Sequence, residues 1–161
     1  VIMMEKNQWK TYLFWIAAAE GAGALSGWLS RQGTAIYEQT VVKPPFSPPG
    51  IVFPIVWAIL FALMGISAAR ISLTAPSEQR RKCLRLFVLQ LGVNFLWSPI
   101  FFNWQKFGLA LIWLLLLWVL VLSMIRCFYQ LDPPAAWLQI PYLLWLTFAA
   151  YLNFGVWMLN R

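Results

Sequence analysis

Five long stretches of the chain are dominated by apolar residues, and shorter polar stretches separate them. The apolar stretches cover about residues 9–29, 51–73, 84–102, 107–128 and 135–159. Each is close to the roughly 20 residues that an α-helix needs to cross a bilayer. The pattern therefore predicts an all-α polytopic membrane protein, a bundle of five transmembrane helices that forms a single domain over residues 1–161.

The polar stretch before the second apolar run ends in a proline-rich segment. Residues 30–42 are expected to be a polar loop, and the following residues 43–57 contain five prolines. Proline fixes φ and removes the backbone donor, so residues 43–50 are predicted to form a stiff extended lid. Helix is expected from about Ile51, which places Trp57 on the same face as Phe53. A simple tight connector explains the prolines equally well.

The third apolar stretch carries a polar stripe. Gln90, Asn94 and Ser98 recur every four residues and so share one helix face. Inside lipid such a stripe must face protein or a cavity, and interhelical hydrogen bonding explains it as well as ligand contact does. Pro99 leaves the carbonyl of Phe95 without its helical donor and is expected to bend the helix.

An acidic residue interrupts the first apolar stretch. Glu20 lies near its middle, and Gly23-x-x-x-Gly27 follows and predicts close approach of another helix. A carboxyl group inside a membrane is costly and is a candidate functional group. Glu20 is therefore either a proton or cation site, as in a small transporter, or a hydrogen-bonded packing residue.

Composition supports the membrane class and excludes several others. The chain is 61% hydrophobic and only 11% charged, whereas soluble domains average about 25% charged residues. The net charge of +7 indicates loops beside anionic lipid and no nucleic-acid partner. The absence of His excludes His-based triads, His-containing zinc sites and His-ligated haem, and no metal site is expected. Cys83 and Cys127 lack C-x-x-C spacing and indicate no disulfide framework.

The basic residues are distributed unequally between the two ends of the expected bundle. Eight of the 12 Lys and Arg residues lie on the side of the N-terminus, and the other four lie with the proline-rich segment. The positive-inside rule then predicts an inside N-terminus and an outside lid. The most basic segment, residues 74–85, is expected to be a solvated turn. The absence of a targeting peptide fits a bacterial membrane.

Three long motifs occur in order along most of the chain. They are Lys43-Pro44 through Pro48-Pro49-Gly50 to Trp57, then Gln90-Leu91-x-x-Asn94-x-x-Trp97-Ser98-Pro99-x-Phe101-Phe102, then Pro141-Tyr142-Leu143-x-Trp145-x-x-Phe148-Ala149-x-x-Leu152-Asn153. Together they resemble the motifs of the translocator protein family, the tryptophan-rich sensory proteins also known as peripheral-type benzodiazepine receptors.

The resemblance implies a five-helix transmembrane bundle, usually a homodimer. It also implies a cavity, closed by the first loop, that binds porphyrins such as protoporphyrin and haem, with no further cofactor required. Some members bind cholesterol or benzodiazepine-type ligands. The positions that match the family's pocket are Phe53, Val56, Trp57, Asn94, Trp97, Ser98, Trp145, Ala149 and Leu152.

The chemistry of these residues suits a porphyrin, which has a broad π-face and an acidic edge. Trp57 and Trp145 can stack on the face or donate an indole N–H. Lys43 or Arg31 can pair with the propionates. Because the chain has no His to ligate haem iron, a free-base porphyrin is the better-suited ligand.

Two departures from the family pattern affect the expected ligands. The loop tryptophan is Phe46 here, which keeps a stacking face and loses an indole donor. The sterol pattern found in some members needs a Tyr and a nearby Arg, where this chain has Phe154 and Met158. Tight sterol binding is therefore not expected, and the pattern is weak even when intact.

Three functions fit these residues. The first, which we favour, is a membrane receptor or carrier that binds porphyrins and serves in tetrapyrrole sensing, transport or regulation. The second is a light-dependent porphyrin-degrading enzyme, in which Trp57 and Trp145 would be the redox-active residues. No acid–base or nucleophilic site is apparent, so ordinary hydrolysis is not expected. The third is a small proton-coupled transporter that uses Glu20.

Overall fold

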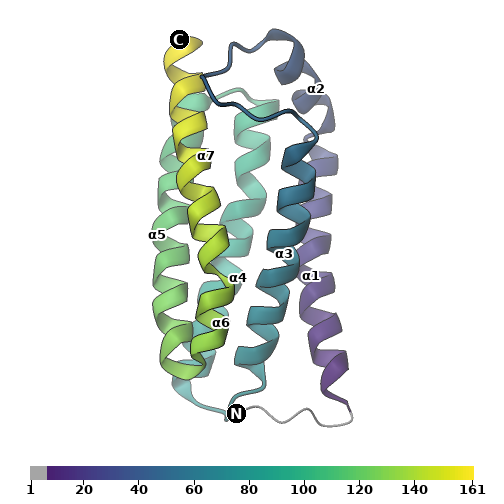
Figure 1. The fold of residues 1–161 in the computed structure, drawn as a ribbon, viewed down its shortest axis with the longest axis vertical. Helices are drawn as coiled ribbons and strands as arrows, with labels where there is room; N and C mark the ends of the chain where they lie inside the picture. Colours follow the sequence, from purple (N-terminus) through teal and green to yellow (C-terminus); the bar gives the residue numbers. More distant parts are fainter. Residues whose placement is uncertain (1–6) are drawn as a thin grey trace.

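The computed structural model describes residues 7–161, and their regular secondary structure is entirely helical (Figure 1). In chain order the elements are α1 (Gln8–Leu29), α2 (Arg31–Thr40), α3 (Val52–Ser72), α4 (Glu78–Ser98), the π-helical turn η1 (Pro99–Asn103), α5 (Phe107–Leu131), α6 (Pro133–Leu138) and α7 (Ile140–Leu159). The long helices α1, α3, α4, α5 and α7 run side by side along the molecule, and α2 lies across one end (Figure 1). The prediction of an all-α bundle is confirmed.

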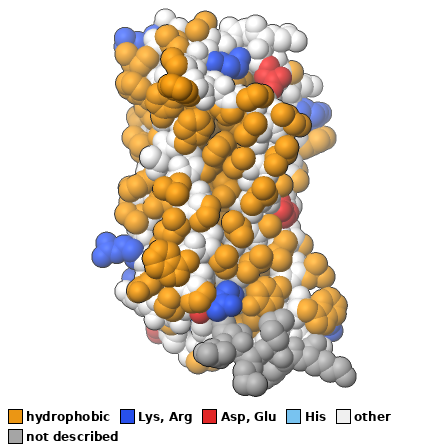
Figure 2. Space-filling model, in the orientation of Figure 1, with side chains coloured by type: hydrophobic (Ala, Val, Ile, Leu, Met, Phe, Trp, Pro, Cys, Tyr) orange, Lys and Arg blue, Asp and Glu red, His pale blue; other side chains and the backbone are white. Residues whose placement is uncertain are grey.

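Four helical units in the described part are long and apolar enough to cross a membrane: Val52–Ser72, Glu78–Asn103, Phe107–Leu131 and Pro133–Leu159. Helix α1 is also long enough, at 22 residues, but Glu20 and its many small residues make it less apolar. It packs lengthwise against α3 and completes the bundle. Hydrophobic side chains cover most of the visible face, with Lys and Arg mainly toward its two ends (Figure 2). This is the surface of a multi-pass membrane protein.

Glycine permits the close packing of α1 on α3. A Cβ atom on Gly65 would overlap the backbone of Ile16, and one on Gly23 would overlap the ring of Phe61. Gly27, in contrast, has open space around it. The expected close approach along Gly23-x-x-x-Gly27 is therefore correct for Gly23 and wrong for Gly27.

The polar segment 30–42, expected to be a loop, contains the helix α2. Gly33 is buried there against η1, so closely that an added Cβ atom would meet the backbone of Phe102. Tyr37 packs edge-on against Phe102, with ring centroids 5.2 Å apart. Contacts with η1, about 70 residues away in the chain, thus stabilise a helix that local pattern does not indicate.

Helix α4 begins at Glu78, well before the expected start of the third span at residue 84. Ser77 caps it, since its Oγ accepts a hydrogen bond from the backbone N–H of Arg80 at 3.0 Å. Glu78 adds a negative charge in the first turn, where it interacts favourably with the positive end of the helix dipole. Residues 78–85 of the basic segment are therefore helical, and the expected turn is confined to residues 74–77.

The helix geometry changes at Pro99. The chain passes from α4 into the π-helical turn η1 at this proline, and the N–H of Trp104 donates to the carbonyl of Pro99 at 3.0 Å. The carbonyl of Phe95 accepts instead from the hydroxyl of Ser26 at 2.7 Å. A side chain of α1 thus satisfies the acceptor that the proline leaves free.

The fifth span is divided in two. Helix α6 starts at Pro133, two residues before the expected start of the fifth span, and a break at Gln139 separates it from α7. Asp132, at the start of α6, accepts two hydrogen bonds from the guanidinium of Arg70 at 2.6 and 3.1 Å. Ser67 also donates to the carbonyl of Ala135 at 2.7 Å, so α3 holds α6 in place.

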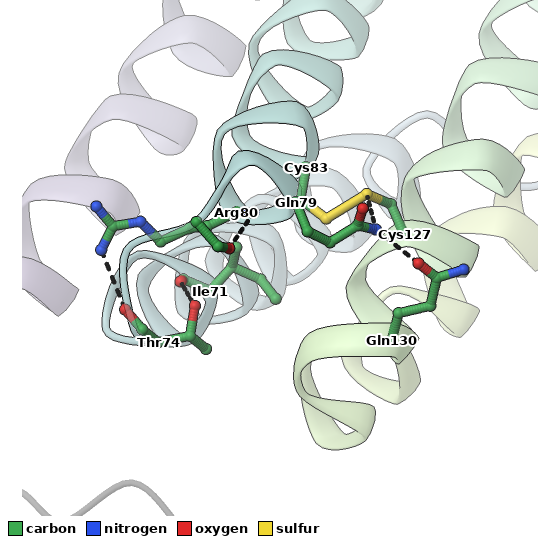
Figure 3. The surroundings of a disulfide bond; sticks show 8 residues. Ile71, Thr74, Gln79, Arg80, Cys83, Cys127 and Gln130 are labelled. Atoms are coloured by element: carbon green, nitrogen blue, oxygen red, sulfur yellow. Dashed lines mark hydrogen bonds between the residues drawn. A yellow bond between two sulfur atoms is a disulfide. The ribbon is translucent and has the colours of Figure 1, made fainter.

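Cys83 of α4 and Cys127 of α5 form a disulfide, so the expectation of no disulfide was wrong (Figure 3). The two Cα atoms are 5.6 Å apart although the residues are separated by 44 positions. Spacing along the chain carries no signal for such a pair, because antiparallel packing of α4 and α5 brings the two cysteines together. Beside the bond, Gln79 Nε2 donates to Gln130 Oε1 at 2.6 Å.

Candidate functional site

Large aromatic side chains fill the space between α3 and α7, below the proline-rich loop. We call Phe53, Trp57, Tyr142 and Trp145 the aromatic cluster. The ring centroids of Phe53 and Trp57 lie 5.9 and 6.4 Å from that of Trp145. Trp57 also meets Tyr142 edge-on at 6.2 Å and stacks on Phe61 at 5.4 Å. The predicted pair Phe53 and Trp57 therefore does share a face, and that face meets Trp145.

Polar groups border the aromatic cluster on its α4 side. The hydroxyl of Tyr142 accepts from Asn94 Nδ2 at 2.6 Å and donates to Gln90 Oε1 at 2.8 Å. All three side chains are buried. The polar stripe of α4 thus forms interhelical hydrogen bonds at Gln90 and Asn94. The Nε2 of Gln90 is buried without a partner among the described residues. Ser98, also on the stripe, is half-buried.

Trp97 lies in a second aromatic group, with the residues of η1. It stacks on Phe101, with ring centroids 4.8 Å apart, and meets Phe102 edge-on at 5.8 Å. Its Nε1 donates to Asn153 Oδ1 at 3.2 Å, and Asn153 Nδ2 donates to the carbonyl of Phe107 at 2.9 Å. The structure thus joins Trp97 to α7 through Asn153, separately from the contacts of Trp57.

The remaining predicted pocket residues lie on the helices that carry these two groups. Val56 is half-buried on α3 and packs against the main core. On α7, Ala149 is half-buried and Leu152 is buried. Ala149 follows Trp145 by one helical turn and precedes Asn153 by one, so it lies on the same face between the two aromatic groups.

The proline-rich loop is attached to α7 by side chains that the sequence did not single out. Tyr151 donates its hydroxyl proton to the carbonyl of Pro45 at 2.7 Å. Asn160 Oδ1 accepts from the N–H of Val42 at 3.0 Å, and its Nδ2 donates to the Val42 carbonyl at 2.7 Å. Pro44 is buried directly over Gly155, and a Cβ atom on Gly155 would lie only 2.5 Å from the proline ring. These contacts hold the loop over the end of α7.

The two cations expected near the cavity mouth are engaged elsewhere. Lys43 Nζ donates to the carbonyls of Tyr37, Glu38 and Val41 at 3.2–3.3 Å and so caps the end of α2. It also lies 4.8 Å from the centroid of the Tyr37 ring. Burial raises the pKa of the Tyr37 hydroxyl to about 12, and the charge of Glu38 adds to the effect. Tyr37 is therefore neutral at ordinary pH.

Three other sequence candidates lie at the periphery. Arg31 covers the ring of Trp28, with its Cζ 4.1 Å from the ring centroid. Phe46, which replaces the family's loop tryptophan, is 86% exposed and has a left-handed φ of 66°. Glu20 is half-buried on α1, and its carboxyl group makes no hydrogen bond or ion pair with other side chains or carbonyls in residues 7–161.

The fold and these contacts define a polytopic α-helical membrane protein with an aromatic site beneath a proline-rich loop. The TspO/MBR family model matches residues 15–158, and the chain belongs to this family.

Relatives occur in bacteria and in animals. The chain is similar to a tryptophan-rich sensory protein of Cereibacter sphaeroides, 36% identical over 94% of this chain and 92% of the relative. It is also similar to the tryptophan-rich protein TspO of Chlorobaculum tepidum, 38% identical over 77% and 79% of the two chains. The translocator protein of Bos taurus is 34% identical over 86% and 85%. The chain is therefore a multi-pass integral membrane protein of the sensory and translocator type.

Proposed function

We propose that the protein binds a porphyrin between α3 and α7, beneath the proline-rich loop, and acts as a tetrapyrrole receptor or carrier. The observation that carries this proposal is the aromatic cluster. Helices α3 and α7 are not among the closely packed helix pairs, and the ring contacts of Phe53 and Trp57 with Trp145 bridge them. A flat conjugated ligand can replace those ring–ring contacts with ring–ligand contacts of the same kind.

The partial exposure of the aromatic side chains supports entry of such a ligand. Phe53, Trp57 and Trp145 are each half-buried, so rotation about their side-chain torsions opens space without unfolding a helix. The backbones of α3 and α7 are fixed by other neighbours, α3 by α1 and α7 by α5. Ligand binding therefore requires rearrangement of side chains and of the loop, while the bundle stays intact.

The polar border supports a ligand that presents a hydrogen-bond acceptor. Gln90 Nε2 is a buried donor without a partner in residues 7–161, next to the hydroxyl of Tyr142. Buried donors are costly to leave unpaired, so a ligand acceptor or a water molecule at this position would be favourable. A porphyrin propionate, in contrast, gains Lys43 only if that side chain leaves its three carbonyl partners.

Tryptophan fluorescence quenching by protoporphyrin tests the proposal, with the purified protein in detergent and in the dark. Wild type is expected to show saturable quenching with a Kd in the micromolar range or below, about −8 kcal/mol or stronger. Trp57→Phe and Trp145→Phe are each expected to weaken binding by about tenfold, roughly 1.4 kcal/mol. Trp104→Phe is the matched control, because Trp104 is 62% exposed and belongs to neither aromatic group.

Each other outcome has a definite meaning. Equal weakening by all three substitutions, or no saturable quenching, would contradict the assignment of the site. Under illumination, loss of porphyrin absorbance that both Trp57→Phe and Trp145→Phe abolish would favour the porphyrin-degrading enzyme. Loss of cation transport in Glu20→Gln, with porphyrin binding unchanged, would favour the proton-coupled transporter.

A further inference from the structure

A groove with a basic rim lies on the outward face of α4, at the end of the bundle opposite the proline-rich loop. It has a volume of about 550 Å³. Its lining includes the basic side chains of Arg80, Arg81 and Arg85, which we call the rim, and the apolar side chains of Leu84, Val88 and Leu89, which we call the floor. We call it the basic groove. It is distinct from the aromatic cluster, which α4 borders only through Gln90 and Asn94, further along the same helix.

The groove changes from charged to aliphatic along the helix axis. Arg81 and Leu89 are eight residues apart, which corresponds to about 12 Å along an α-helix. One headgroup region is about 5–8 Å thick, because the two regions together add about 10–15 Å to the hydrocarbon core, so a stretch of helix of about 12 Å reaches from the headgroups into the hydrocarbon. Val88 and Leu89 are 59% and 52% exposed on a helix that crosses the membrane, so they face lipid. The groove therefore matches the polarity of a phospholipid from headgroup to acyl chain.

The first arginine is held in place by the backbone. Arg80 Nη1 donates to the carbonyls of Ser72 and Thr74 at 3.1 and 3.0 Å, and Figure 3 shows its side chain extending toward Thr74. This contact attaches the start of α4 to the end of α3. Arg80 thus fixes one side of the groove and still presents its remaining N–H groups.

The other two arginines have donors available for a ligand. Arg81 pairs with Glu78 at 2.6 Å, but both side chains are largely exposed, and such surface pairs contribute little. Arg85 is exposed and makes no hydrogen bond or ion pair with the described residues. A phosphate group can accept hydrogen bonds from both guanidinium groups, each in bidentate geometry. A single surface cation would offer it fewer donors.

The back of this helical segment is fixed. Cys83 lies on the face of α4 opposite the groove and is bonded to Cys127 of α5 (Figure 3). It is fully buried, whereas Arg81 and Arg85 on either side of it in sequence are exposed. The arginines are thus carried by a helix end that is anchored to both α3 and α5, so little ordering of backbone is required on binding.

We propose that the basic groove binds one anionic phospholipid, with its phosphate between Arg81 and Arg85 and an acyl chain along Leu84, Val88 and Leu89. The charge of the rim selects an anionic over a zwitterionic headgroup. The aliphatic floor selects a lipid over a free phosphate ester. The site is independent of the porphyrin proposal, because it shares no residue with the aromatic cluster.

Native mass spectrometry of the full chain in neutral detergent tests the proposal. The probe is phosphatidylglycerol, compared with phosphatidylcholine of the same acyl chains and with glycerol 3-phosphate. Wild type is expected to retain one phosphatidylglycerol at concentrations where neither other probe binds. The double variant Arg81→Gln/Arg85→Gln is expected to lose about 25-fold in affinity, since each arginine near an anionic headgroup contributes roughly a fivefold factor.

Two further variants sharpen the result. Lys82→Gln also removes one positive charge from the first turns of α4, but Lys82 does not line the groove. The affinity of this variant for phosphatidylglycerol is expected to stay within about twofold of wild type. Glu78→Gln releases Arg81 from its ion pair and is expected to tighten binding by about threefold. Raising the salt concentration should weaken binding to wild type and leave the double variant nearly unchanged.

Several outcomes would overturn the proposal. Equal binding of phosphatidylcholine, or an equal loss in Lys82→Gln and in the double variant, would show that no specific headgroup site exists. Binding of glycerol 3-phosphate as tight as that of the lipid would show that the apolar floor contributes nothing. Circular dichroism checks the fold of each variant, and the single variant Arg85→Gln replaces the double variant if the latter is unfolded.

Discussion

At the scale of single residues, hydrogen bonds between distant positions decide how the helices meet. Helical spacing was sufficient to predict that Phe53 and Trp57 share a face, and that Gln90 and Asn94 share another. It could not identify Tyr151 and Asn160, because their partners in the loop are 106 and 118 positions away. Local pattern reports which residues share a helix face, whereas the partner across the bundle depends on how the helices pack.

Tyr142 shows how much one such contact contributes. We predict that Tyr142→Phe lowers the free energy of unfolding by about 1–2 kcal/mol, since it leaves Asn94 Nδ2 and Gln90 Oε1 buried without the shared hydroxyl. Thermal unfolding in detergent, followed by circular dichroism, measures the effect. Tyr129→Phe is the control, because Tyr129 is 53% exposed, and it should change stability by less than about 0.5 kcal/mol. Equal effects of the two substitutions would contradict the role given to the Tyr142 hydroxyl.

At the scale of elements, the lengths of the apolar stretches predicted the five spans, and the majority of the span ends are correct to within a few residues. The larger errors have two physical causes. The start of α4 was misplaced because the charged first turns of a membrane helix lie in the headgroup region and look like a loop in sequence. Helix α2 was missed because Gly33 and Tyr37 gain their contacts from η1, far away in the chain. The apolar pattern reports the part of a helix inside hydrocarbon and no more.

The packing of α1 on α3 yields a prediction with an internal control. We expect Gly65→Ala to destabilise the protein by about 1–3 kcal/mol, because the added methyl group overlaps the backbone of Ile16 and separates the helices. Gly92→Ala on α4 has open space around the new methyl group and should instead stabilise by about 0.5–1 kcal/mol. The midpoints of thermal unfolding of the two variants should therefore move in opposite directions. A Gly65→Ala variant as stable as wild type would mean that α1 packs less closely.

At the scale of the whole molecule, the bundle has two different ends. One end carries the proline-rich loop, α2 and the C-terminus, and the other carries the basic groove and the junction of α3 with α6 (Figure 1). The aromatic cluster lies below the loop, so a ligand of that cluster and a lipid in the groove would approach from opposite sides of the membrane.

Sided labelling of cysteines tests this arrangement. Phe46→Cys in the loop and Lys82→Cys at the start of α4 are both exposed positions, and the two native cysteines are buried. In sealed vesicles an impermeant maleimide is expected to label only one of the two variants, and labelling of the other should require permeabilisation. The unequal distribution of Lys and Arg predicts that Lys82→Cys is the variant labelled from inside. Labelling of both from the same side would contradict the five-span bundle.

The bond between Cys83 and Cys127 makes the covalent structure of the protein depend on its direction of insertion. Both sulfur atoms belong to the end that the charge distribution assigns to the cytoplasm, where glutathione keeps thiols reduced. A chain inserted that way keeps two free thiols and holds α4 to α5 by packing alone. A chain inserted the other way carries a permanent cross-link in an oxidising compartment. The oxidation state of these two cysteines in acid-quenched cells therefore records which way the protein entered the membrane.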